Sequence, residues 1–522
     1  MSNKIIQNIV GGSRSSDIVK VCRAFSDNLY VETQDSSQAS SSSMLRSIRG
    51  TELSMMMPEA QCRGLYRASR GFEGTPVMFG CFGVGVYCIY KPSSTGVITY
   101  AKVGVVSRTG NTPVHFCETG GEGSAHPHLI CTDGANVFAV QSDLEPFAMA
   151  DDWRAIALPL RAGSTAQKIT PTHCAYLYGY LIVNDAGTDA FYTSYHYPFE
   201  TTDTDGNIDY DIFQLATYDG YGFVTYSEWM PDNTTALICT GSHLWTYGPR
   251  SNQIFSYNND INYPFTSADN AAAAVGIKAP DSLATVGDMV FWLASSDIGE
   301  NGIYMGQGTE STRISTPDIE REIASFSYPQ DAVGQSWQEN QHVFYSITFL
   351  TDKRTFVYDV GEKAWHNRSS YRFGYWRPQF ATLFDGKIFF GERDSRALCC
   401  MAKKWTEWDG NVIVRRRVGG VASADFSPFY IESLRLVCNN GQVPERLPTL
   451  KPQVMARFSW DGGTTWSDAE LGCLGEIGHY QFHTDFWHLG SGDIFTAEFS
   501  VSDDVDFSII SAKIDASACN VF

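Results

Sequence analysis

The sequence predicts a mainly β fold, in which a β-propeller-like array of about six or seven hairpin blades is followed by a C-terminal β-sandwich-like domain. Hydrophobic residues make up 43% of the chain and charged residues only 18%, with 32 Phe, 26 Tyr and 46 Gly, which suits sheets and tight turns better than long helices. A chain of 522 residues is too long for one ordinary core. Apolar runs on either side of a Gly- or Asp-containing turn recur near the ~40–50-residue length of a propeller blade.

Residues 1–58 are expected to form an extended N-terminal arm. The segment 23–32 (RAFSDNLYVE) alternates polar and apolar residues like a strand. The segment 36–43 (SSQASSSS) has the composition of a flexible polar loop. We expect such an arm to dock elsewhere on the molecule.

Residues 59–404 carry the recurring hairpins of the expected propeller. Their turns are separated by 49, 45, 62, 46, 53 and 46 residues, counted between Gly85, Gly134, Gly179, Gly241, Gly287, Asn340 and Gly386. This irregular spacing implies insertions between some blades, and an ordinary pair of β-sandwiches with many hairpins is the alternative. Two short helices are expected as connectors, at 142–153 (SDLEPFAMADDW) and 267–277 (SADNAAAAVGI).

The stretch 288–327 shows the repeating unit most clearly, as strand, turn, strand, loop and one short helix. Met289–Leu293 and Ile303–Met305 are apolar runs separated by a polar turn cluster. Thr316 is the expected N-cap of the helix, with Pro317 at its first position. Ile319, Ile323 and Phe326 follow at helical spacing, which predicts that they pack onto a sheet.

Residues 405–522 lack the blade spacing and are expected to form a separate small sandwich domain. Six strands are predicted here, at 411–418, 428–438, 452–460, 478–487, 494–501 and 507–516.

The charge and cysteine content limit the classes of function. The formal net charge of −20 argues against a dedicated nucleic-acid binder, which needs a basic surface, but not against a wall that DNA slides past. The 13 Cys show no regular spacing and no C-x-x-C pair, which argues against a structural zinc site and favours reduced, mostly buried thiols. No secretory signal opens the chain and no apolar run has the length of a membrane span.

The segment 459–466 (SWDGGTTW) matches the Asp-box pattern S-x-D-x-G-x-T-W. Its chemistry is structural, because the aspartate accepts N–H groups of the turn, a glycine supplies positive φ, and the tryptophan is expected to pack beneath the hairpin. The residues that match are Ser459, Asp461, Gly463, Thr465 and Trp466. The motif resembles that of sialidases, which carry several copies together with an arginine triad, a Tyr/Glu pair and an acidic residue.

Two clusters contain residue types that can act as metal ligands. The loop 200–211 places Asp203, Asp205, Asn207 and Asp209 at alternate positions; a Ca²⁺ loop is one interpretation and a solvated acidic loop is the other, since the glycine and the twelfth residue of an EF-hand do not fit. His479 and His483 share a face of a strand, whereas His488 points to the other. No metal site is predicted from either cluster.

Arg415, Arg416 and Arg417 form the sharpest basic run, and we expect them at an exposed contact surface. An acidic partner is one interpretation, and an edge strand guarded by charge is the other.

The chain contains no G-x-S-x-G, Walker, H-E-x-x-H or Rossmann fingerprint. We therefore predict no catalytic residue, no cofactor-binding residue, no cofactor and no enzyme activity. From the residues alone the chain is a large acidic β-repeat protein that takes part in assembly or binding.

Several segments resemble, in the same order, those of the packaged-DNA stabilisation proteins of short-tailed phages, also called tail hub or nozzle proteins. The resemblance includes ISTPDIEREIASFS (314–327) with the preceding MVFWLASSDIGENGIYMG, and it extends to NLYVE and LRSIRG near the start, to segments within 191–248, to TFVYDVGEKAWHN (355–367), and to RFSWDGGTTWSD and FSIISAKIDA near the end. This chain departs from the family in its greater length, with a Cys- and Gly-rich insertion before residue 130.

The resemblance implies a homohexameric ring below the portal and its adaptor subunits, which is assembled in the host cytoplasm and becomes part of the virion tail. Such a ring extends the channel through which double-stranded DNA passes, closes it after packaging, and offers attachment sites for tail fibres or spikes and for a needle or plug. A glycan-binding or sialidase-like propeller protein of the virion is the alternative. A receptor-binding tail fibre is a third possibility, which a hexameric ring would exclude.

Overall fold

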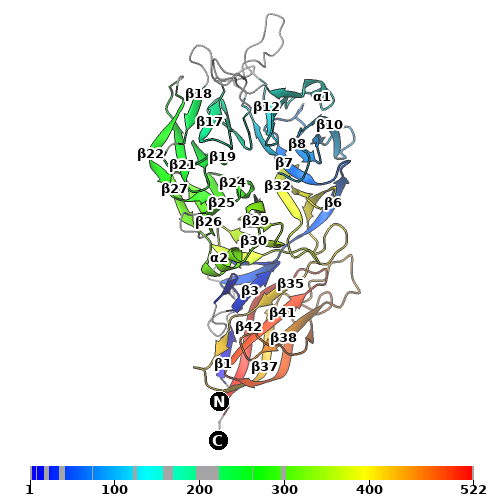
Figure 1. Cartoon of the computed structure of the whole chain (residues 1–522). Helices are drawn as coiled ribbons and strands as arrows, with labels where there is room; N and C mark the ends of the chain where they lie inside the picture. Colours follow the sequence, from blue (N-terminus) through cyan, green and yellow to red (C-terminus); the bar gives the residue numbers. More distant parts are fainter. Residues whose placement is uncertain are drawn as a thin grey trace, which may run out of the picture.

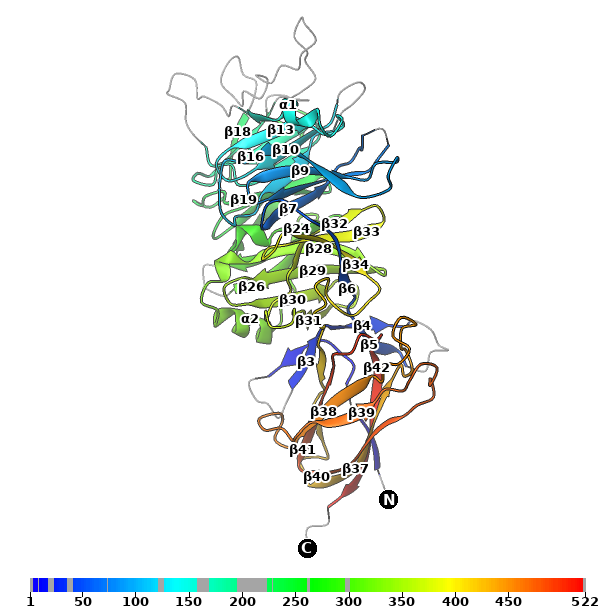
Figure 2. The ribbon, with the colours of Figure 1, turned by 90° about the vertical axis from the view of Figure 1, so that its right-hand side faces the viewer.

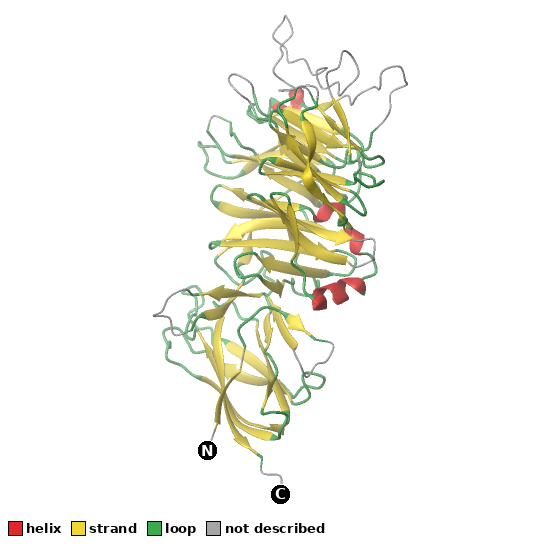
Figure 3. Ribbon diagram, turned by 90° about the vertical axis from the view of Figure 1, so that its left-hand side faces the viewer, coloured by secondary structure: helices red, strands yellow, loops and turns green. Residues whose placement is uncertain are grey.

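The structure is a computed structural model that describes residues 3–7, 9–16, 23–34, 41–72, 74–120, 126–156, 169–194, 223–227, 229–260, 263–295 and 301–519. Within these ranges the chain is almost entirely β (Figure 3), and none of its helices has the length and hydropathy that a bilayer crossing needs. Figure 1 shows a large propeller above a smaller β domain, with both chain ends at the far end of the smaller domain.

The described residues form seven antiparallel blades, so the prediction of a propeller is confirmed and the blade number is seven. The first blade is built from β7 (Cys62–Arg67), β8 (Val77–Phe82), β9 (Gly85–Tyr90) and β10 (Thr99–Val105). The second is built from β11 (His115–Glu118), β12 (His128–Thr132), β13 (Val137–Gln141) and β14 (Arg154–Ile156), with α1 (Met149–Asp152) before β14. The third is built from β15 (Cys174–Leu177), β16 (Tyr180–Asn184), β17 (Ala190–Thr193) and β18 (Phe223–Tyr226).

The fourth, fifth and sixth blades follow in chain order. The fourth blade has β19 (Ala236–Thr240), β20 (His243–Tyr247), β21 (Asn252–Tyr257) and β22 (Phe265–Ala273). The fifth has β23 (Gly276–Ile277), β24 (Ala284–Val286), β25 (Met289–Ser295), β26 (Asn301–Gln307) and β27 (Glu310–Arg313), with η2 (Pro280–Ser282) before β24. The sixth has β28 (Val333–Glu339), β29 (His342–Phe349), β30 (Arg354–Asp359) and β31 (Ala364–Asn367). Helix α2 (Pro317–Ala324) and η3 (Pro329–Asp331) connect the fifth blade to the sixth.

The seventh blade closes the ring with strands from opposite ends of the propeller sequence. Its strands β32 (Pro378–Phe384), β33 (Lys387–Glu392) and β34 (Ala397–Ala402) pair in order, and the fourth is β6 (Gly50–Met56), which pairs antiparallel with β34. Figure 2 shows β6 rising from the smaller domain along the edge of the propeller. The circle is thus held shut by backbone hydrogen bonds as well as by side-chain packing.

An apolar cluster fills each of the seven interfaces between neighbouring blades. The cluster of Met78, Phe82, Phe384 and Leu398 joins the first blade to the seventh and completes the circle. Because both faces of most blades are covered, their strands are continuously apolar; all six residues of β8 are buried. This two-sided burial explains why the sequence shows apolar runs rather than simple alternation.

The glycine markers of the sequence fall on hairpin turns, but not on the same turn of every blade. Gly179, Gly241, Gly287, Asn340 and Gly386 lie between the first and second pairing strands of their blades, and each has positive φ. In the second blade Gly134 lies one hairpin later, between the second and third strands, and in the first blade Gly85 is the first residue of β9, directly after the corresponding turn. The irregular spacing therefore has a structural cause in addition to insertions.

The smaller domain is a two-sheet sandwich, as predicted. One sheet has the order β4 (Leu29–Thr33), β5 (Ser43–Ser47), β42 (Ser508–Ala518), β37 (Phe429–Cys438) and β40 (Thr484–Gly492), with β1 (Asn3–Gln7) beside β42. The other has β3 (Arg23–Asp27), β35 (Arg415–Val418), β41 (Ile494–Val501), β38 (Gln453–Ser459) and β39 (Glu470–Cys473), with β2 (Arg14–Ser15) and β36 (Ala422–Ser423) at its edges. One apolar core, including Leu45, Ile431, Phe458 and Phe499, lies between them.

The N-terminal segment contributes to both parts of the fold. Strands β1 to β5 belong to the sandwich, and β6 belongs to the propeller. The expected division into 1–58, 59–404 and 405–522 stays a prediction. Of the Ser-rich loop 36–43, residues 36–40 lie outside the described residues.

Two local predictions are wrong. The helix predicted at 267–277 does not form, because β22 pairs with β21 in the fourth blade and β23 pairs with β25 in the fifth. The strand expected at 478–487 begins only at Thr484, since the preceding residues form turns. The expectation of reduced thiols agrees with the twelve described cysteines, all of which are free.

Candidate functional site

A groove of ≈ 490 Å³ lies where the propeller meets the sandwich. The propeller contributes α2, β30 and β31, and the sandwich contributes β3, β35 and the Asp-box turn. Three features that the sequence singled out therefore meet in one place, because the groove is lined by Glu322 of α2, by Arg416, and by Trp466. We call this cavity the junction groove.

Helix α2 forms the propeller wall of the junction groove. Pro317 occupies its first turn, and Ile319 and Ile323 are buried in the apolar cluster between the fifth and sixth blades, as predicted. Phe326 packs edge-on against Phe349 at 4.8 Å between ring centroids. Thr316 is the N-cap residue, as predicted, although its hydroxyl makes no cap hydrogen bond. Tertiary packing of the apolar face holds this short helix instead.

Arginine side chains stack on one phenylalanine across the junction groove. The Phe25 ring of β3 lies 5.6 Å from the guanidinium carbon of Arg354 and 4.9 Å from that of Arg416. Arg354 also pairs with Glu322 at 2.7 Å, and Arg416 with Glu498 at 3.4 Å. Cation–π contacts between partly buried groups are worth roughly 0.5–2 kcal/mol each. The Phe25–Arg354 contact thus links the sandwich to the propeller, whereas Arg416 is itself a residue of the sandwich.

Asn28 joins the same two domains by hydrogen bonds. This residue is fully buried and has φ 57°. Its side-chain amide donates to the carbonyls of Ser369 at 3.0 Å and Val414 at 2.9 Å, and its side-chain oxygen accepts the Ser369 N–H at 3.0 Å. Ser369 directly follows the sixth blade, and Val414 directly precedes β35. One side chain therefore ties the end of a blade to the start of a sandwich strand.

The Asp-box forms the turn that its sequence predicts. The Asp461 carboxylate accepts the N–H groups of Thr464 at 2.8 Å and Thr465 at 2.9 Å, and the Thr465 hydroxyl at 2.6 Å. These hydrogen bonds, above all the one from the Thr465 side chain, lower the pKa of Asp461. Gly463 donates its N–H to the Ser459 hydroxyl at 2.7 Å and has positive φ.

The tryptophan that packs on the core is not the one expected. Trp460 contacts Phe429 and Phe495 and donates its Nε1–H to the Leu489 carbonyl at 3.0 Å. Trp466 instead lines the junction groove, with the Arg457 guanidinium 5.5 Å from its ring. The motif lies in the sandwich and not in the propeller, so this turn belongs to the junction rather than to a propeller mouth.

The expected exposed arginine triad is wrong for two of its three members. Arg415 and Arg417 are buried, because alternate residues of β35 point into the sandwich. Arg415 donates to the carbonyls of Val501 at 3.3 Å, Val505 at 2.7 Å and Asp503, and burial lowers its pKa to about 10. Arg417 donates to the Ile9 carbonyl at 2.7 Å. Only Arg416 keeps a substantially exposed side chain.

The histidine cluster near residue 480 does not converge. Asp485 is paired with Arg435 through two hydrogen bonds of 2.7 and 2.9 Å, and His488 Nδ1 lies 3.1 Å from the Tyr430 hydroxyl. The acidic loop 200–211, with Asp203, Asp205, Asn207 and Asp209, lies outside the described residues.

A different titratable cluster, which the sequence did not reveal, lies at the propeller axis. His115, His173 and Asp281 come from three blades and place their ligand atoms within 4.8 Å of one another. These residues are far apart in the sequence and carry no motif, so only the circular order of the blades brings them together. No signal within the sequence alone would have identified them.

Comparison with known proteins gives one family and a general likeness of fold. Residues 170–405, which span the third to seventh blades, match the family model described as Bacteriophage P22 Gp10, β-propeller. No curated protein sequence matches the chain.

Three similar solved structures illustrate the likeness. An ancestral GH74 enzyme is 10% identical, with 72% of this chain and 51% of that chain covered and a TM-score of 0.41. The N-terminal domain of Nup159 is 9% identical, with 72% of this chain and 98% of that chain covered, and the β-propeller domain of Myceliophteria thermophila Cps50 (Swd1) is 7% identical, with 67% and 98% covered; both have a TM-score of 0.36.

Proposed function

From the match of residues 170–405 to the phage β-propeller family model, we propose that the chain is the structural tail hub, or nozzle, of a short-tailed bacteriophage. The family is one of structural phage proteins, which makes the chain a component of the virion. In the proposed role a ring of subunits closes the portal–adaptor channel after packaging and retains the genome. The same ring provides the channel for ejection. The family match is the observation that carries this proposal.

The connection between the two domains supports a structural role, because it resists separation of the propeller from the sandwich. The N-terminal segment runs through the sandwich and then completes the seventh blade, so the domains share one continuous strand path. Asn28 and Phe25 add hydrogen bonds and cation–π contacts at the junction. A component that retains pressurised DNA benefits from domains that cannot separate without breaking paired strands.

The charge supports a passive channel rather than a specific DNA site. With a net charge of −20, the subunit repels the phosphate backbone on average, so DNA can pass without being held. We propose double-stranded DNA as a transient occupant, the portal adaptor as the upper neighbour, and tail fibres or spikes and a needle or plug as further partners. We also propose a homohexameric ring, in which each subunit makes the same heterologous contact with the next.

The decisive experiment compares particles assembled with and without this protein. Electron microscopy reports whether the distal tail is present, and nuclease protection reports whether packaged DNA is retained. We expect filled heads that leak their DNA and lack the distal tail, and restoration of both properties by purified wild-type protein. Intact, DNA-retaining particles that only fail to bind host glycans would refute the hub and favour a glycan-binding role.

The oligomeric state is tested separately. Sedimentation of the purified chain, alone and mixed with the adaptor ring, should give six copies per complex. A stable trimer of elongated shape would instead favour a tail fibre.

A further inference from the structure

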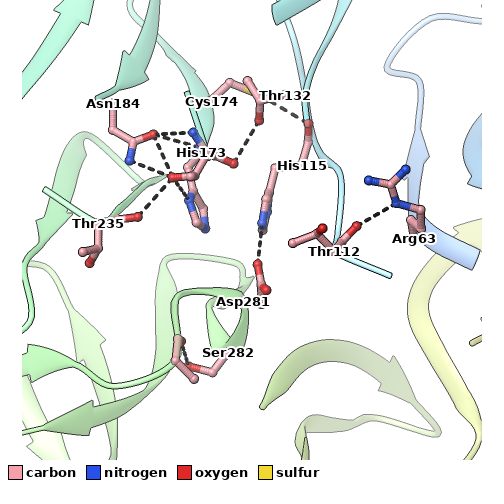
Figure 4. Close-up of polar contacts among 12 residues, drawn as sticks. Arg63, Thr112, His115, Thr132, His173, Cys174, Asn184, Thr235, Asp281 and Ser282 are labelled. Atoms are coloured by element: carbon pink, nitrogen blue, oxygen red, sulfur yellow. Dashed lines mark hydrogen bonds and ion pairs between the residues drawn. The ribbon is translucent and has the colours of Figure 1, made fainter. Parts of the chain in front are cut away.

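The innermost strands of the blades converge on the propeller axis and enclose a cavity of ≈ 270 Å³. His115 is the first residue of β11, His173 directly precedes β15, and Asp281 lies in η2 before β24. All three therefore stand at the entry end of an innermost strand, in the second, third and fifth blades. Figure 4 shows His115 and His173 side by side with Asp281 facing them.

The distances in this cluster are close to those of a coordinated ion. His115 Nε2 lies 3.1 Å from Asp281 Oδ1, the two imidazole rings are 3.9 Å apart, and all ligand atoms lie within 4.8 Å of one another. Ligand atoms of a tetrahedral zinc ion with bonds of about 2.0–2.1 Å are separated by roughly 3.3 Å. A small rotation of one side chain would close the difference, and the side chains of His115 and Asp281 are partly exposed and have room to turn.

His173 is held with one nitrogen committed and the other available. It is almost completely buried, and its Nδ1 lies 3.0 Å from the Thr172 hydroxyl. Metal binding at Nε2 requires the tautomer in which Nδ1 donates to the Thr172 hydroxyl, and that hydroxyl has two oxygen acceptors for its own proton, the Thr235 carbonyl at 3.1 Å and the Asn184 side-chain oxygen at 3.2 Å. Nε2 then carries the lone pair, and this buried atom has no hydrogen bond of acceptable geometry within the described structure.

Asn184 holds Thr172 and His173 in place by hydrogen bonds. The Asn184 side-chain oxygen accepts the N–H groups of Thr172 at 3.2 Å and His173 at 2.8 Å, and its amide donates to the Thr172 hydroxyl at 2.8 Å. Outer-sphere partners of this kind orient a ligating histidine and set its tautomer.

We propose that His115 Nε2, His173 Nε2 and the Asp281 carboxylate bind a divalent transition-metal ion of the zinc class at the propeller axis. Two imidazole nitrogens and one carboxylate oxygen suit such an ion better than Ca²⁺ or Mg²⁺, which prefer all-oxygen shells. A water molecule would complete the fourth position. The ion would join three blades at the point where the ring has no backbone pairing between them. This proposal departs from the sequence-based expectation that the chain has no metal site.

The test uses the full-length chain, stripped with EDTA and then titrated with Zn²⁺. Wild-type protein should retain one Zn²⁺ per chain after dialysis and should melt at a higher temperature with Zn²⁺ than with EDTA. The double variant His115→Gln/Asp281→Asn should lose more than 100-fold in Zn²⁺ affinity and the thermal shift. The matched control is His126→Gln/Asp143→Asn, which removes an exposed His–Asp pair of 2.9 Å elsewhere in the propeller and should behave as wild type.

Two further measurements keep the result independent of folding. Co²⁺ should give the visible absorption of a four-coordinate site in wild type and in the control, but not in the double variant. Thr172→Val should weaken Zn²⁺ binding roughly 10–100-fold, as loss of an outer-sphere partner does. Equal melting temperatures in EDTA show that the variants are folded. If the double variant is not folded, Asp281→Asn alone replaces it in these measurements. Equal Zn²⁺ affinity in wild type and in the ligand variants, or no retained Zn²⁺, would overturn the proposal.

Discussion

Replacing Asn28 should loosen the connection between the propeller and the sandwich. Asn28→Gly removes the side chain but keeps a backbone that tolerates φ 57°. Asn28→Ala removes the same side chain and also places an alanine in the left-handed region. Comparing the two substitutions therefore separates the lost hydrogen bonds from the backbone strain.

The magnitude follows from three hydrogen bonds of 2.9–3.0 Å. At about 1 kcal/mol for each partner left unsatisfied, Asn28→Gly should cost about 3 kcal/mol in the free energy of unfolding. The left-handed conformation adds roughly 1–2 kcal/mol for Asn28→Ala. A loss of about 3 kcal/mol corresponds to a Tm decrease of roughly 6–12 °C for domains of this size.

Differential scanning calorimetry of the full-length protein is the appropriate assay, because it reports how many transitions occur as well as their temperatures. We expect the sandwich and propeller transitions to move apart in Asn28→Gly and further apart in Asn28→Ala. Asn259→Gly is the control, since Asn259 also has positive φ but lies in the turn between β21 and β22 of the fourth blade, away from the junction. An Asn28→Gly profile within 1–2 °C of wild type, with the transitions unseparated, would refute the reasoning.

Three further predictions concern closure, buried charge and pH. Gly50→Ala should destabilise the seventh blade and lower the Tm of the propeller by several degrees, because its Cβ would lie 2.1 Å from the Thr406 carbonyl oxygen, whereas Gly187→Ala, with no atom within 4 Å, should melt as wild type. Arg415→Met should cost about 3 kcal/mol in urea unfolding by leaving three carbonyls unpaired, and the partly exposed Arg416→Met less than about 1 kcal/mol; equal costs would contradict the burial of Arg415. The hydrogen bond from His342 to Asp359 at 2.6 Å raises the pKa of His342, so its stabilisation is fully present below the ordinary value of 6.5 and is lost as the pH rises through the folded-state pKa. Unfolding measured at several pH values should show that the stability difference between wild type and His342→Gln shrinks as the pH increases, and a difference independent of pH would contradict this assignment.

Features that depend on neighbouring residues could be predicted from the sequence. The Asp461 turn and the apolar face of α2 follow from patterns within a few residues. The strand at 494–501 coincides with β41 because it is a compact run with turn residues at both ends. Recurring hairpins indicated a propeller because each blade repeats the same local unit.

Features that depend on distant pairing could not be predicted. Nothing in the sequence of β6 indicates that it pairs with β34. The arginine run was expected outside because three adjacent charges are usually solvated, but the alternation of β35 turns two of them inward, where backbone carbonyls satisfy them. His115, His173 and Asp281 meet only after the ring has closed.

Closure by β6 also restricts the order in which the molecule can fold during synthesis. The strand is complete once residue 56 has been made, but its partner β34 is not available until residue 402. The sandwich waits longer still, because β1 and β5 pair with β42 at the end of the chain. Strands β1 and β6 must therefore wait for these partners while nearly the whole chain emerges from the ribosome, which exposes strand edges to wrong partners. Blades one to six can form as they appear, because each is built from consecutive strands, so synthesis should yield an open arc that becomes a ring only after translation of the last blade.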